Sequence, residues 1–443
     1  MHIFIVGAGE VGFHIARSLV PEGHDLVVVE ADPDHAQKVQ AELDVMAVQG
    51  DGCDPHLLKH HGVENADLFF SVSDSDAVNL LAALTARGLG AKQCIARLGN
   101  PQYGQNPLLL ADKDITPLHP ERLVAEEILG LTRVPGVSKA HFFEDGKLLL
   151  LRARPSRDAD IYHRPLRELP GADGWILVGV ERSGKLTIPR GNTELKPARR
   201  IYAVGRSETT REFLKAIEIE APPVRKVVIA GAGHVGSWLA KKLVEDNVQV
   251  TVIQRQPQKA LALATEVPGA LVLQGDATDT SLLREAGAQD ADYFVAATQD
   301  DESNVISSYL AHEAGARIVV SLYQRPEFLN VLRAARVDIG LSPRLITAGT
   351  ILRMVHRREI LSLDLVGSGE AEVVEFQIPE GSRVLRGPLS KLKLPKDSIV
   401  GAVVRGEERY VPGGDFTFEV GDRALVFTLS EALPPLEKLF RAR

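Results

Sequence analysis

Short apolar runs alternate with amphipathic stretches in the first part of the chain, from Ile3 to about Leu131. The runs are predicted to form the strands Ile3–Val6, Leu26–Val29, Val45–Gln49, Leu68–Val72, Gln93–Ala96 and Ile115–Leu118. Helices are predicted to begin near Glu10, Pro33, Pro55, Asp76 and Pro101, because proline and acidic residues suit a first helical turn. Apolar runs with little alternation are typical of strands buried on both faces, so the pattern predicts a parallel sheet covered by helices.

The pattern changes after Pro135-Gly136. Here the predicted strands are short, at Lys147–Arg152, Trp175–Glu181 and Arg200–Val204, and they are separated by residues that favour turns, chiefly Gly, Pro and Asp. This pattern of short strands and turns predicts a small α+β domain.

The whole arrangement then occurs a second time. Three motifs return in the same order and at nearly the same spacing: Gly7–Gly12 as Gly231–Gly236, Gly50-Asp51-Gly52 as Gly275-Asp276-Ala277, and Val72–Asn79 as Ala297–Asn304. The spacing is too long for a solenoid repeat and indicates a tandem duplication. The predicted fold is therefore α/β, with two Rossmann-like doubly wound parallel sheets, each followed by a small α+β domain. The predicted domains are 1–133, 134–218, 225–354 and 358–441, and the proline-rich segment Glu220–Val224 joins the two halves.

The first glycine motif follows a predicted strand and opens a predicted helix, which is the context that dinucleotide binding requires. In it, Gly7 permits the tight turn, Gly9 lets the backbone approach a pyrophosphate, and Gly12 lets helix and strand pack closely. Backbone N–H groups and the helix dipole then favour phosphate. Glu30 ends the second strand, where a carboxylate can accept both ribose hydroxyls, so NAD(H) or another adenine nucleotide is favoured over NADP. The alternative is a tight strand–helix turn without a ligand.

The second motif, Gly231–Gly236, also follows an apolar strand, Val227–Ala230. At the position equivalent to Glu30 it has Gln254, followed by Arg255. An amide can bond a ribose hydroxyl but carries no charge, whereas Arg255 can reach a phosphate. The second site therefore either prefers a different nucleotide or is vestigial.

Further candidates lie at the ends of the third, fourth and fifth strands. Asp51 and Asp276 are predicted to be carboxylates beside a bound adenine, with a helix N-cap as the alternative. Ser73 and Asp74 lie at the mouth of the sheet, where ligands bind in doubly wound folds. Arg97 can neutralise a phosphate or, alternatively, form an exposed salt bridge, and its counterpart near Ser321 is not basic.

Composition and the remaining motifs narrow the class of protein. The chain has 443 residues and a net charge of −8, which argues against nucleic acid or anionic lipid as the main partner. Cys53 and Cys94 are the only two cysteines, so a disulfide framework is excluded and a reducing intracellular compartment is expected. Both cysteines are predicted to be buried. The N-terminus does not resemble a signal peptide, and no apolar run approaches the roughly 18 residues of a membrane span. His56 and His60 have metal-ligand spacing, but a solvated helix face is the favoured interpretation.

Taken together, the motifs resemble the TrkA family, the cytosolic regulatory subunits of the bacterial Trk potassium-uptake system, which contain tandem RCK domains. The resemblance covers essentially the whole chain and rests on Gly7–Gly12, Val48–Gly52, Ile95–Arg97, Val134–Gly136, Gly275–Ala277, Gln324–Pro326, Ile339–Pro343, Leu394-Pro395, Ile399–Gly406 and Val420–Arg423. There are two departures from the family pattern. Gln254 replaces an acidic residue, and Leu195–Arg199 replaces the turn that Gly421-Asp422 makes in the last domain, so the first small domain looks degenerate.

The resemblance implies NAD(H) as ligand, with ATP and ADP as alternative or competing ligands. It implies that nucleotide is bound by these residues: Gly7, Ala8, Gly9, Glu10, Val11, Glu30, Ser73, Asp74, Arg97, Gly231, Ala232, Gly233, His234, Val235 and Asp276. Gly12 and Gly236 complete the two glycine motifs. It also implies a homotetrameric ring on the inner face of the cell membrane, attached to a channel subunit of the TrkH or TrkG type.

These expectations favour ligand-gated regulation over catalysis. Charge around the pyrophosphate, from Glu10, His234 and Arg97, is expected to discriminate ATP from ADP. One alternative is an NAD-dependent oxidoreductase with duplicated domains, although a concentrated set of catalytic residues is missing from the sequence. Another alternative is a regulator of a different cation transporter.

Overall fold

The computed structural model describes residues 1–442 apart from 101, 104–113, 145, 157, 164–165, 169–173, 183–184, 192, 194, 198–199, 221, 356–362 and 367–370. The helix expected near Pro101 and the last two residues of Leu195–Arg199 lie outside the described residues. The chain forms two compact units. One contains Met1–Glu126 and Lys226–Val355, and the other contains Glu127–Arg225 and His356–Arg443. Like domains of the two halves are thus grouped together.

The first sheet is doubly wound and parallel. Its strands are β1 (His2–Val6), β2 (Asp25–Glu30), β3 (Met46–Gln49), β4 (Leu68–Ser71), β5 (Cys94–Arg97) and β6 (Ile115–Leu118), in the spatial order β3-β2-β1-β4-β5-β6. Its helices are α1 (Glu10–Leu19), α2 (Pro33–Glu42), α3 (Pro55–His60), α4 (Asp76–Leu89) and α6 (Pro120–Arg133). The predicted strands and the helix starts at Glu10, Pro33, Pro55 and Asp76 are confirmed. The order reverses between β1 and β4, which places the ligand-binding edge of such a sheet there.

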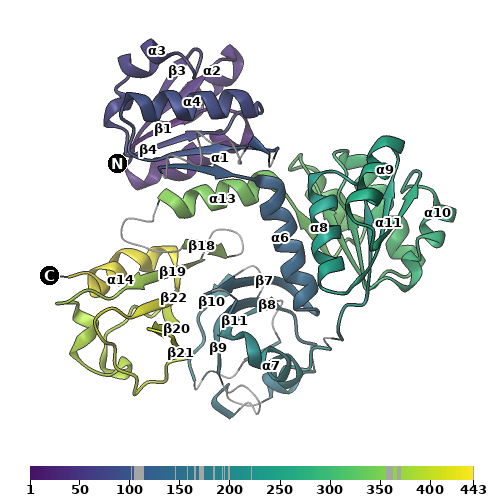
Figure 1. Ribbon diagram of the computed structural model, residues 1–443. Helices are drawn as coiled ribbons and strands as arrows, with labels where there is room; N and C mark the ends of the chain where they lie inside the picture. Colours follow the sequence, from purple (N-terminus) through teal and green to yellow (C-terminus); the bar gives the residue numbers. More distant parts are fainter. Residues whose placement is uncertain are drawn as a thin grey trace. The chain divides into compact units, whose positions relative to one another are not determined.

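The second sheet repeats this topology (Figure 1). Its strands are β12 (Lys226–Ala230), β13 (Gln249–Gln254), β14 (Ala270–Gln274), β15 (Tyr293–Ala296), β16 (Ile318–Leu322) and β17 (Ile339–Leu341), in the order β14-β13-β12-β15-β16-β17. Its helices are α8 (His234–Glu245), α9 (Pro257–Glu266), α10 (Thr280–Glu285), α11 (Asp301–Ala314), α12 (Phe328–Ala334) and α13 (Pro343–Val355). Within this unit, α1 of the first half packs against α13 of the second.

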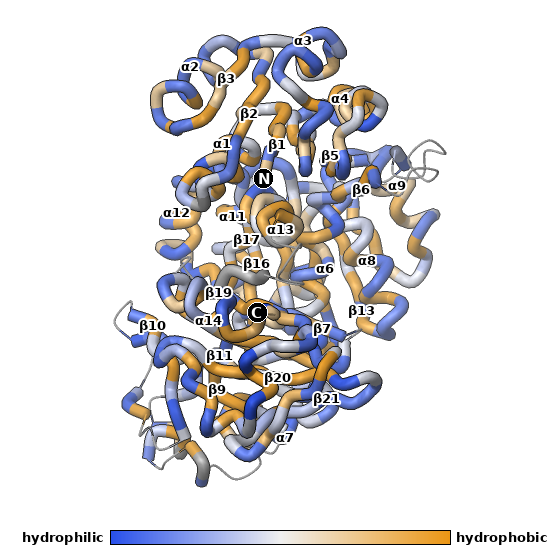
Figure 2. Tube along the Cα trace, turned by 90° about the vertical axis from the view of Figure 1, so that its left-hand side faces the viewer, coloured by the Kyte–Doolittle hydropathy of each residue, from blue (hydrophilic) through white to orange (hydrophobic). Residues whose placement is uncertain are grey.

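The other unit holds two antiparallel sheets of equivalent order. The first has β7 (Val137–Phe143), β8 (Leu148–Ala153), β9 (Trp175–Arg182), β10 (Lys185–Thr187) and β11 (Arg200–Arg206), followed by α7 (Thr210–Ala216). The second has β18 (Leu363–Val366), β19 (Ala371–Gln377), β20 (Ser398–Arg405), β21 (Glu408–Tyr410) and β22 (Arg423–Leu429), followed by α14 (Leu433–Phe440). The strands are rich in apolar residues, as β2, β9 and β20 show in Figure 2.

The two small domains share one hydrophobic core. Tyr202 and Val204 of β11 pack in it together with Phe427 of β22 and Ala402 of β20, and all four are almost fully buried. A second core, which includes Phe376, Phe418 and Phe440, belongs to the last domain alone. The first small domain therefore depends on the second for part of its apolar burial.

Candidate functional site

The first glycine loop joins β1 to α1, and its three glycines meet different surroundings. Gly7 has a φ of +97°, and a Cβ there would lie 2.8 Å from the backbone nitrogen of Ser73. A Cβ on Gly12 would lie 1.8 Å from the carbonyl oxygen of Gly7. By contrast, a Cβ on Gly9 would have nothing within 4 Å. Turn geometry and close packing therefore require Gly7 and Gly12, whereas Gly9 leaves an open side on which a ligand can approach the backbone.

Glu30, the last residue of β2, lies beside this loop. One carboxylate oxygen accepts a hydrogen bond from the backbone N–H of Ala8, and the other accepts one from the N–H of Asp32 at 2.9 Å. An ionised carboxylate offers about four lone-pair positions. Glu30 therefore keeps acceptor capacity for hydroxyl groups after both backbone contacts are made.

The ends of β4 and β5 are held together by a residue that sequence reasoning did not single out, Asn79 on α4. Its buried side chain donates to the carbonyl oxygens of Ser73 at 2.9 Å and Arg97 at 2.8 Å. Its amide oxygen accepts from the N–H and the hydroxyl of Ser73, each at 2.8 Å. Asn304 makes the equivalent bonds with Thr298 and Leu322 in the second half. The one available signal was the presence of both asparagines at the ends of the repeated segments.

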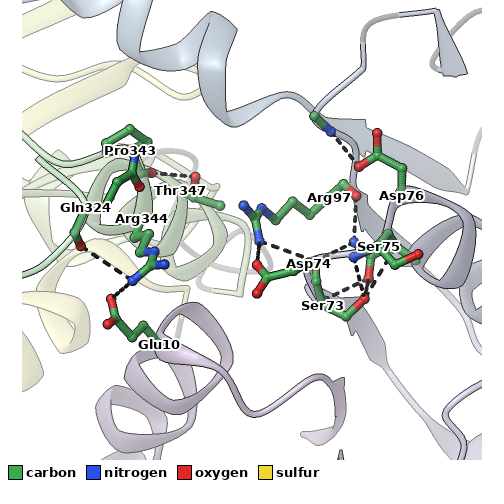
Figure 3. A network of polar contacts seen from close by, with 12 residues as sticks. Glu10, Ser73, Asp74, Ser75, Asp76, Arg97, Gln324, Pro343, Arg344 and Thr347 are labelled. Carbon is green, nitrogen blue, oxygen red and sulfur yellow. Dashed lines mark hydrogen bonds and ion pairs between the residues drawn. The ribbon is translucent and has the colours of Figure 1, made fainter. Parts of the chain in front are cut away.

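Arg97 and Asp74 point toward each other at this mouth (Figure 3). The guanidinium bonds the Asp74 carboxylate at 2.9 Å and the Ser73 carbonyl oxygen at 3.3 Å. The side chain of Arg97 is only 20% exposed, whereas that of Asp74 is 91% exposed. The salt-bridge interpretation of Arg97 is thus what the structure shows, although the arginine is more buried than that interpretation assumed.

The alternative interpretation of Asp51 and Asp276 as helix N-caps is wrong. Asp54 caps α3 by accepting from the N–H of His56, and Asp279 caps α10 by accepting from the N–H of Ser281. Asp51 instead closes a turn through the N–H of Cys53 at 2.9 Å. Asp276 does the same through Thr278, whose N–H and hydroxyl hold the pKa of Asp276 below its ordinary value.

The second glycine loop has the same backbone geometry as the first, but no carboxylate equivalent to Glu30 lies beside it. Gly231 has a φ of +106°, a Cβ on Gly236 would lie 2.0 Å from the Gly231 oxygen, and Gly233 faces open space. Gln254 is buried, and its single side-chain oxygen accepts from the N–H of Gln256 at 2.9 Å. Arg255 is 74% exposed and lies 4.0 Å from the Asp276 carboxylate.

The loops also reach residues of the opposite half within the same unit. Glu10 opens α1 and pairs with Arg344 of α13, another residue that sequence reasoning missed (Figure 3). His234 opens α8 and acts electrostatically on Glu121 of α6. Burial raises the pKa of Glu121, and a hydrogen bond from its own backbone, followed by the electrostatic effects of Arg97 and His234, partly offsets this rise.

The remaining candidate side chains, two histidines and two cysteines, do not form a metal site or another reactive cluster among the described residues. His56 and His60 are exposed on α3, and among the residues that the structure describes, no group of three His, Cys, Asp or Glu side chains is placed to hold a metal ion. Cys94 is buried and Cys53 half-buried; burial raises the pKa of the Cys53 thiol. No helix in the described part of the chain has the length and apolar character to cross a membrane.

Comparison with known proteins agrees with this geometry. The family model of the TrkA-N domain matches residues 3–113 and 227–343, and that of the TrkA-C domain matches residues 152–218 and 373–441. The chain belongs to the TrkA family. The Trk system potassium uptake protein TrkA homolog of Archaeoglobus fulgidus is 35% identical over 446 residues, which cover 100% of both chains. The TrkA of Halomonas elongata is 30% identical, over 100% of this chain and 99% of the relative.

Solved structures show the same fold at lower identity. The GsuK channel bound to NAD matches with a TM-score of 0.63 and 22% identity, over 100% of this chain and 79% of that chain. GsuK bound to ADP matches with a TM-score of 0.51 and 19% identity, over 81% of this chain and 70% of that one. These likenesses support the predicted architecture of two Rossmann-like sheets with small companion domains.

Proposed function

We propose that this chain is a nucleotide-sensing regulatory subunit of a Trk-type potassium-uptake system. The observation that carries the proposal is full-length membership of the TrkA family, combined with a first glycine loop that has an open backbone face and a carboxylate beside it. Relatives that match over their whole length are named potassium uptake proteins of the Trk system. The role proposed is regulation and not catalysis.

NAD(H) is the proposed ligand of the first site. The open side of Gly9 accommodates a pyrophosphate against backbone N–H groups at the start of α1. Glu30 would accept hydrogen bonds from the ribose hydroxyls and would repel a 2′-phosphate, which favours NAD(H) over its phosphorylated form. ATP and ADP would compete for the same loop because they share the adenosine and diphosphate groups.

Nucleotide binding is proposed to act through the contact between Glu10 and Arg344. Glu10 belongs to the loop that faces the phosphates, and Arg344 belongs to α13 of the other nucleotide-binding domain. A bound phosphate would compete with the Glu10 carboxylate for the guanidinium, and a triphosphate would do so more strongly than a diphosphate. A ligand shifts such a contact only through its different affinity for two arrangements, which ATP and ADP provide by their charge.

The membrane partner is proposed to be an integral-membrane channel subunit of the TrkH or TrkG type. Four copies of this chain would form a ring attached to that subunit on the inner face of the cell membrane. Family membership supports this part of the proposal, because the relatives' names place them in an uptake system. Movement of the ring would then be passed to the channel subunit.

Isothermal titration of the purified chain with NADH, NAD, ATP and ADP tests the ligand assignment. Glu30→Ala should weaken NADH binding at the first site by about tenfold or more, since a hydrogen bond to a charged group contributes about 1.5–3 kcal/mol. Asp276→Ala reports on the second site, and Gln254→Glu should strengthen NADH binding there by supplying the missing charge. If the wild-type chain binds none of the four nucleotides, the sensing role is wrong and a structural adaptor remains.

A further inference from the structure

The turns that follow β2 and β13, the equivalent strands of the two nucleotide-binding sheets, carry opposite charges. Each turn runs from the last residue of the strand into the first turn of the next helix, over residues 30–35 and 254–259. The first turn has no lysine or arginine and contains three carboxylates, those of Glu30, Asp32 and Asp34. The second has no carboxylate and contains two cations, Arg255 and Lys259. Beyond the strand's last residue, every residue of both turns is exposed.

In a doubly wound sheet, this turn lies beside the adenosine ribose of a bound dinucleotide. An acidic residue there accepts a hydrogen bond from the ribose 2′-hydroxyl, whereas an arginine accommodates a 2′-phosphate. The second glycine loop starts next to its turn, because the N–H of Gly231 donates to the carbonyl oxygen of Ile253 at 2.8 Å. The charge of residues 254–259 would therefore act on the ribose of a ligand bound at that loop.

The last residue of the strand differs in what it offers to this ribose. Gln254 and Glu30 each use one side-chain oxygen to accept the N–H two residues further on, both at 2.9 Å. The remaining atom of Glu30 is a charged acceptor, whereas that of Gln254 is an uncharged NH2 donor. A charged acceptor suits a hydroxyl, and a donor suits a phosphate oxygen.

Arg255 supplies a cation that the first half lacks. Its side chain is 74% exposed and lies 4.0 Å from the carboxylate of Asp276, which is 47% exposed. Exposed ion pairs of this kind hold a side chain weakly, and the same carboxylate already accepts from the N–H and the hydroxyl of Thr278. The first half has Asp51 at the position of Asp276 but Ala31 at the position of Arg255. The guanidinium is thus what distinguishes the second half here.

The start of the following helix differs in the same direction. Asp32 caps α2 by accepting from the N–H groups of Asp34 and His35, both at 3.0 Å. At the equivalent position before α9, Gln256 makes no side-chain cap bond within the described part of the chain. The positive end of α9 is therefore not neutralised by a carboxylate, and Lys259 adds a charge to its first turn.

We propose that the second site takes a dinucleotide with a phosphate on the 2′-oxygen of its adenosine, the class to which NADP(H) belongs. Arg255 and Lys259 would pair with that phosphate, and Gln254 would not repel it. At the first site, the carboxylates of residues 30–35 would repel the same group and leave NAD(H) as the ligand. This inference rests on the proposed nucleotide-sensing function and extends it, because one chain would then respond to both dinucleotide pools.

Titration of the full-length chain with NADPH, followed by calorimetry, tests this assignment. The wild type should bind one NADPH per chain. Arg255→Ala should weaken NADPH binding by about tenfold or more, since it removes a charge-assisted hydrogen bond, and should leave NADH binding at the first site unchanged. Lys241→Ala removes one positive charge from an exposed position in the middle of α8 and should change neither affinity.

Exchange of the two residue pairs makes a matched set of variants. Gln254→Glu/Arg255→Ala gives the second turn the residues of the first, and should replace NADPH binding at that site with NADH binding. Glu30→Gln/Ala31→Arg should give the first site an affinity for NADPH. Circular dichroism confirms that each variant is folded before it is titrated.

Competition against NADPH tests whether the site recognises the position of the phosphate. Adenosine 2′,5′-bisphosphate should compete about tenfold better than the 3′,5′ isomer, because only the former places a charged acceptor where the 2′-phosphate lies. Equal competition would show general attraction of anions and would overturn the assignment.

The outcomes separate this inference from the proposed function. If NADPH does not bind, or binds equally well to Arg255→Ala, the second-site assignment is wrong, while NADH binding that is lost in Glu30→Ala would still support nucleotide sensing. If NADPH binding depends on Arg255 but NADH does not bind, the second-site assignment stands and NAD(H) is wrong for the first site.

Discussion

At the scale of single residues, the glycines of the first loop have separable roles. Gly9→Ala should leave the midpoint of urea unfolding near that of the wild type, because its Cβ would enter open space. Gly12→Ala should lower the free energy of unfolding by about 3 kcal/mol or more, because its Cβ would overlap the Gly7 carbonyl oxygen. Under the proposed function, Gly9→Ala should still lose NADH binding in a titration, since the added methyl group occupies the face that the pyrophosphate needs. Equal stability loss in both variants would contradict this assignment.

A second prediction at this scale concerns Glu375, a buried carboxyl of β19 that pairs with Arg423 at 3.1 Å. Burial raises the pKa of Glu375 above its ordinary value of 4.5. A raised carboxyl pKa means that the folded chain holds the proton more tightly than the unfolded chain. Stability from this group is therefore lost as pH rises from about the ordinary value through the raised one.

The Glu375→Gln variant has no carboxyl to ionise at this position, so it does not lose stability in this way as the pH rises. The difference in unfolding free energy between variant and wild type should accordingly move in favour of the variant as pH rises from about 4 to 7. Urea unfolding at several pH values measures this slope, with Glu431→Gln as an exposed control. A difference that moves in favour of the wild type would show that its ion pairs with Arg423 outweigh burial.

At the scale of elements, one amide side chain fixes the mouth of each doubly wound sheet. Asn79→Ala should cost about 2–4 kcal/mol, because it leaves the N–H and the carbonyl of Ser73 and the carbonyl of Arg97 without their buried partner. Hydrogen exchange should rise at the ends of β4 and β5 and not at β15 and β16. Asn304→Ala should produce the reverse pattern, so the two variants control for each other.

The positions of many helices and strands were predictable from the sequence, because the residues that mark their starts and ends lie next to them in the chain. Apolar runs ending in Gly-x-Gly placed β1 and β12, and an Asp-Pro step or an acidic residue placed the starts of α2, α3 and α4. The strand β7 was missed because Ser138, Lys139 and His141 interrupt its apolar pattern. The alternative interpretation of Asp51 as the cap of α3 was also wrong, because the cap is Asp54, which directly precedes Pro55.

The site residues that sequence reasoning missed were missed for a different reason, which is that their contacts are not local. Arg344 belongs to the site through its ion pair with Glu10, which lies in the other half of the chain, and no local pattern encodes such a contact. Asn79 is part of a repeated segment, but its bonds run to two strand ends that become neighbours only when the sheet forms. Spacing along the chain identified the loops, while the contacts that support them depend on tertiary packing.

At the scale of the whole molecule, the core that the two small domains share predicts that a substitution in one domain also destabilises the other. Phe427→Ala should cost about 3–5 kcal/mol and should raise hydrogen exchange in β9 and β11 of the first small domain as well as in β20 and β22. Phe440→Ala, whose side chain packs in the core of the last domain alone, should cost a similar amount without affecting β9 and β11. Identical exchange patterns in the two variants would contradict a shared core.

That shared core has a consequence for how the chain is made. Val204 of β11 leaves the ribosome long before Phe427 of β22, the residue that shares its core. At about 5–20 residues per second, the intervening stretch of roughly 220 residues takes on the order of 10–45 s to synthesise. During that interval the first half carries an apolar sheet face without its natural cover. Messages truncated between the halves should therefore yield an aggregation-prone polypeptide that the cell must remove. Complete translation is thus a condition of solubility as well as of function.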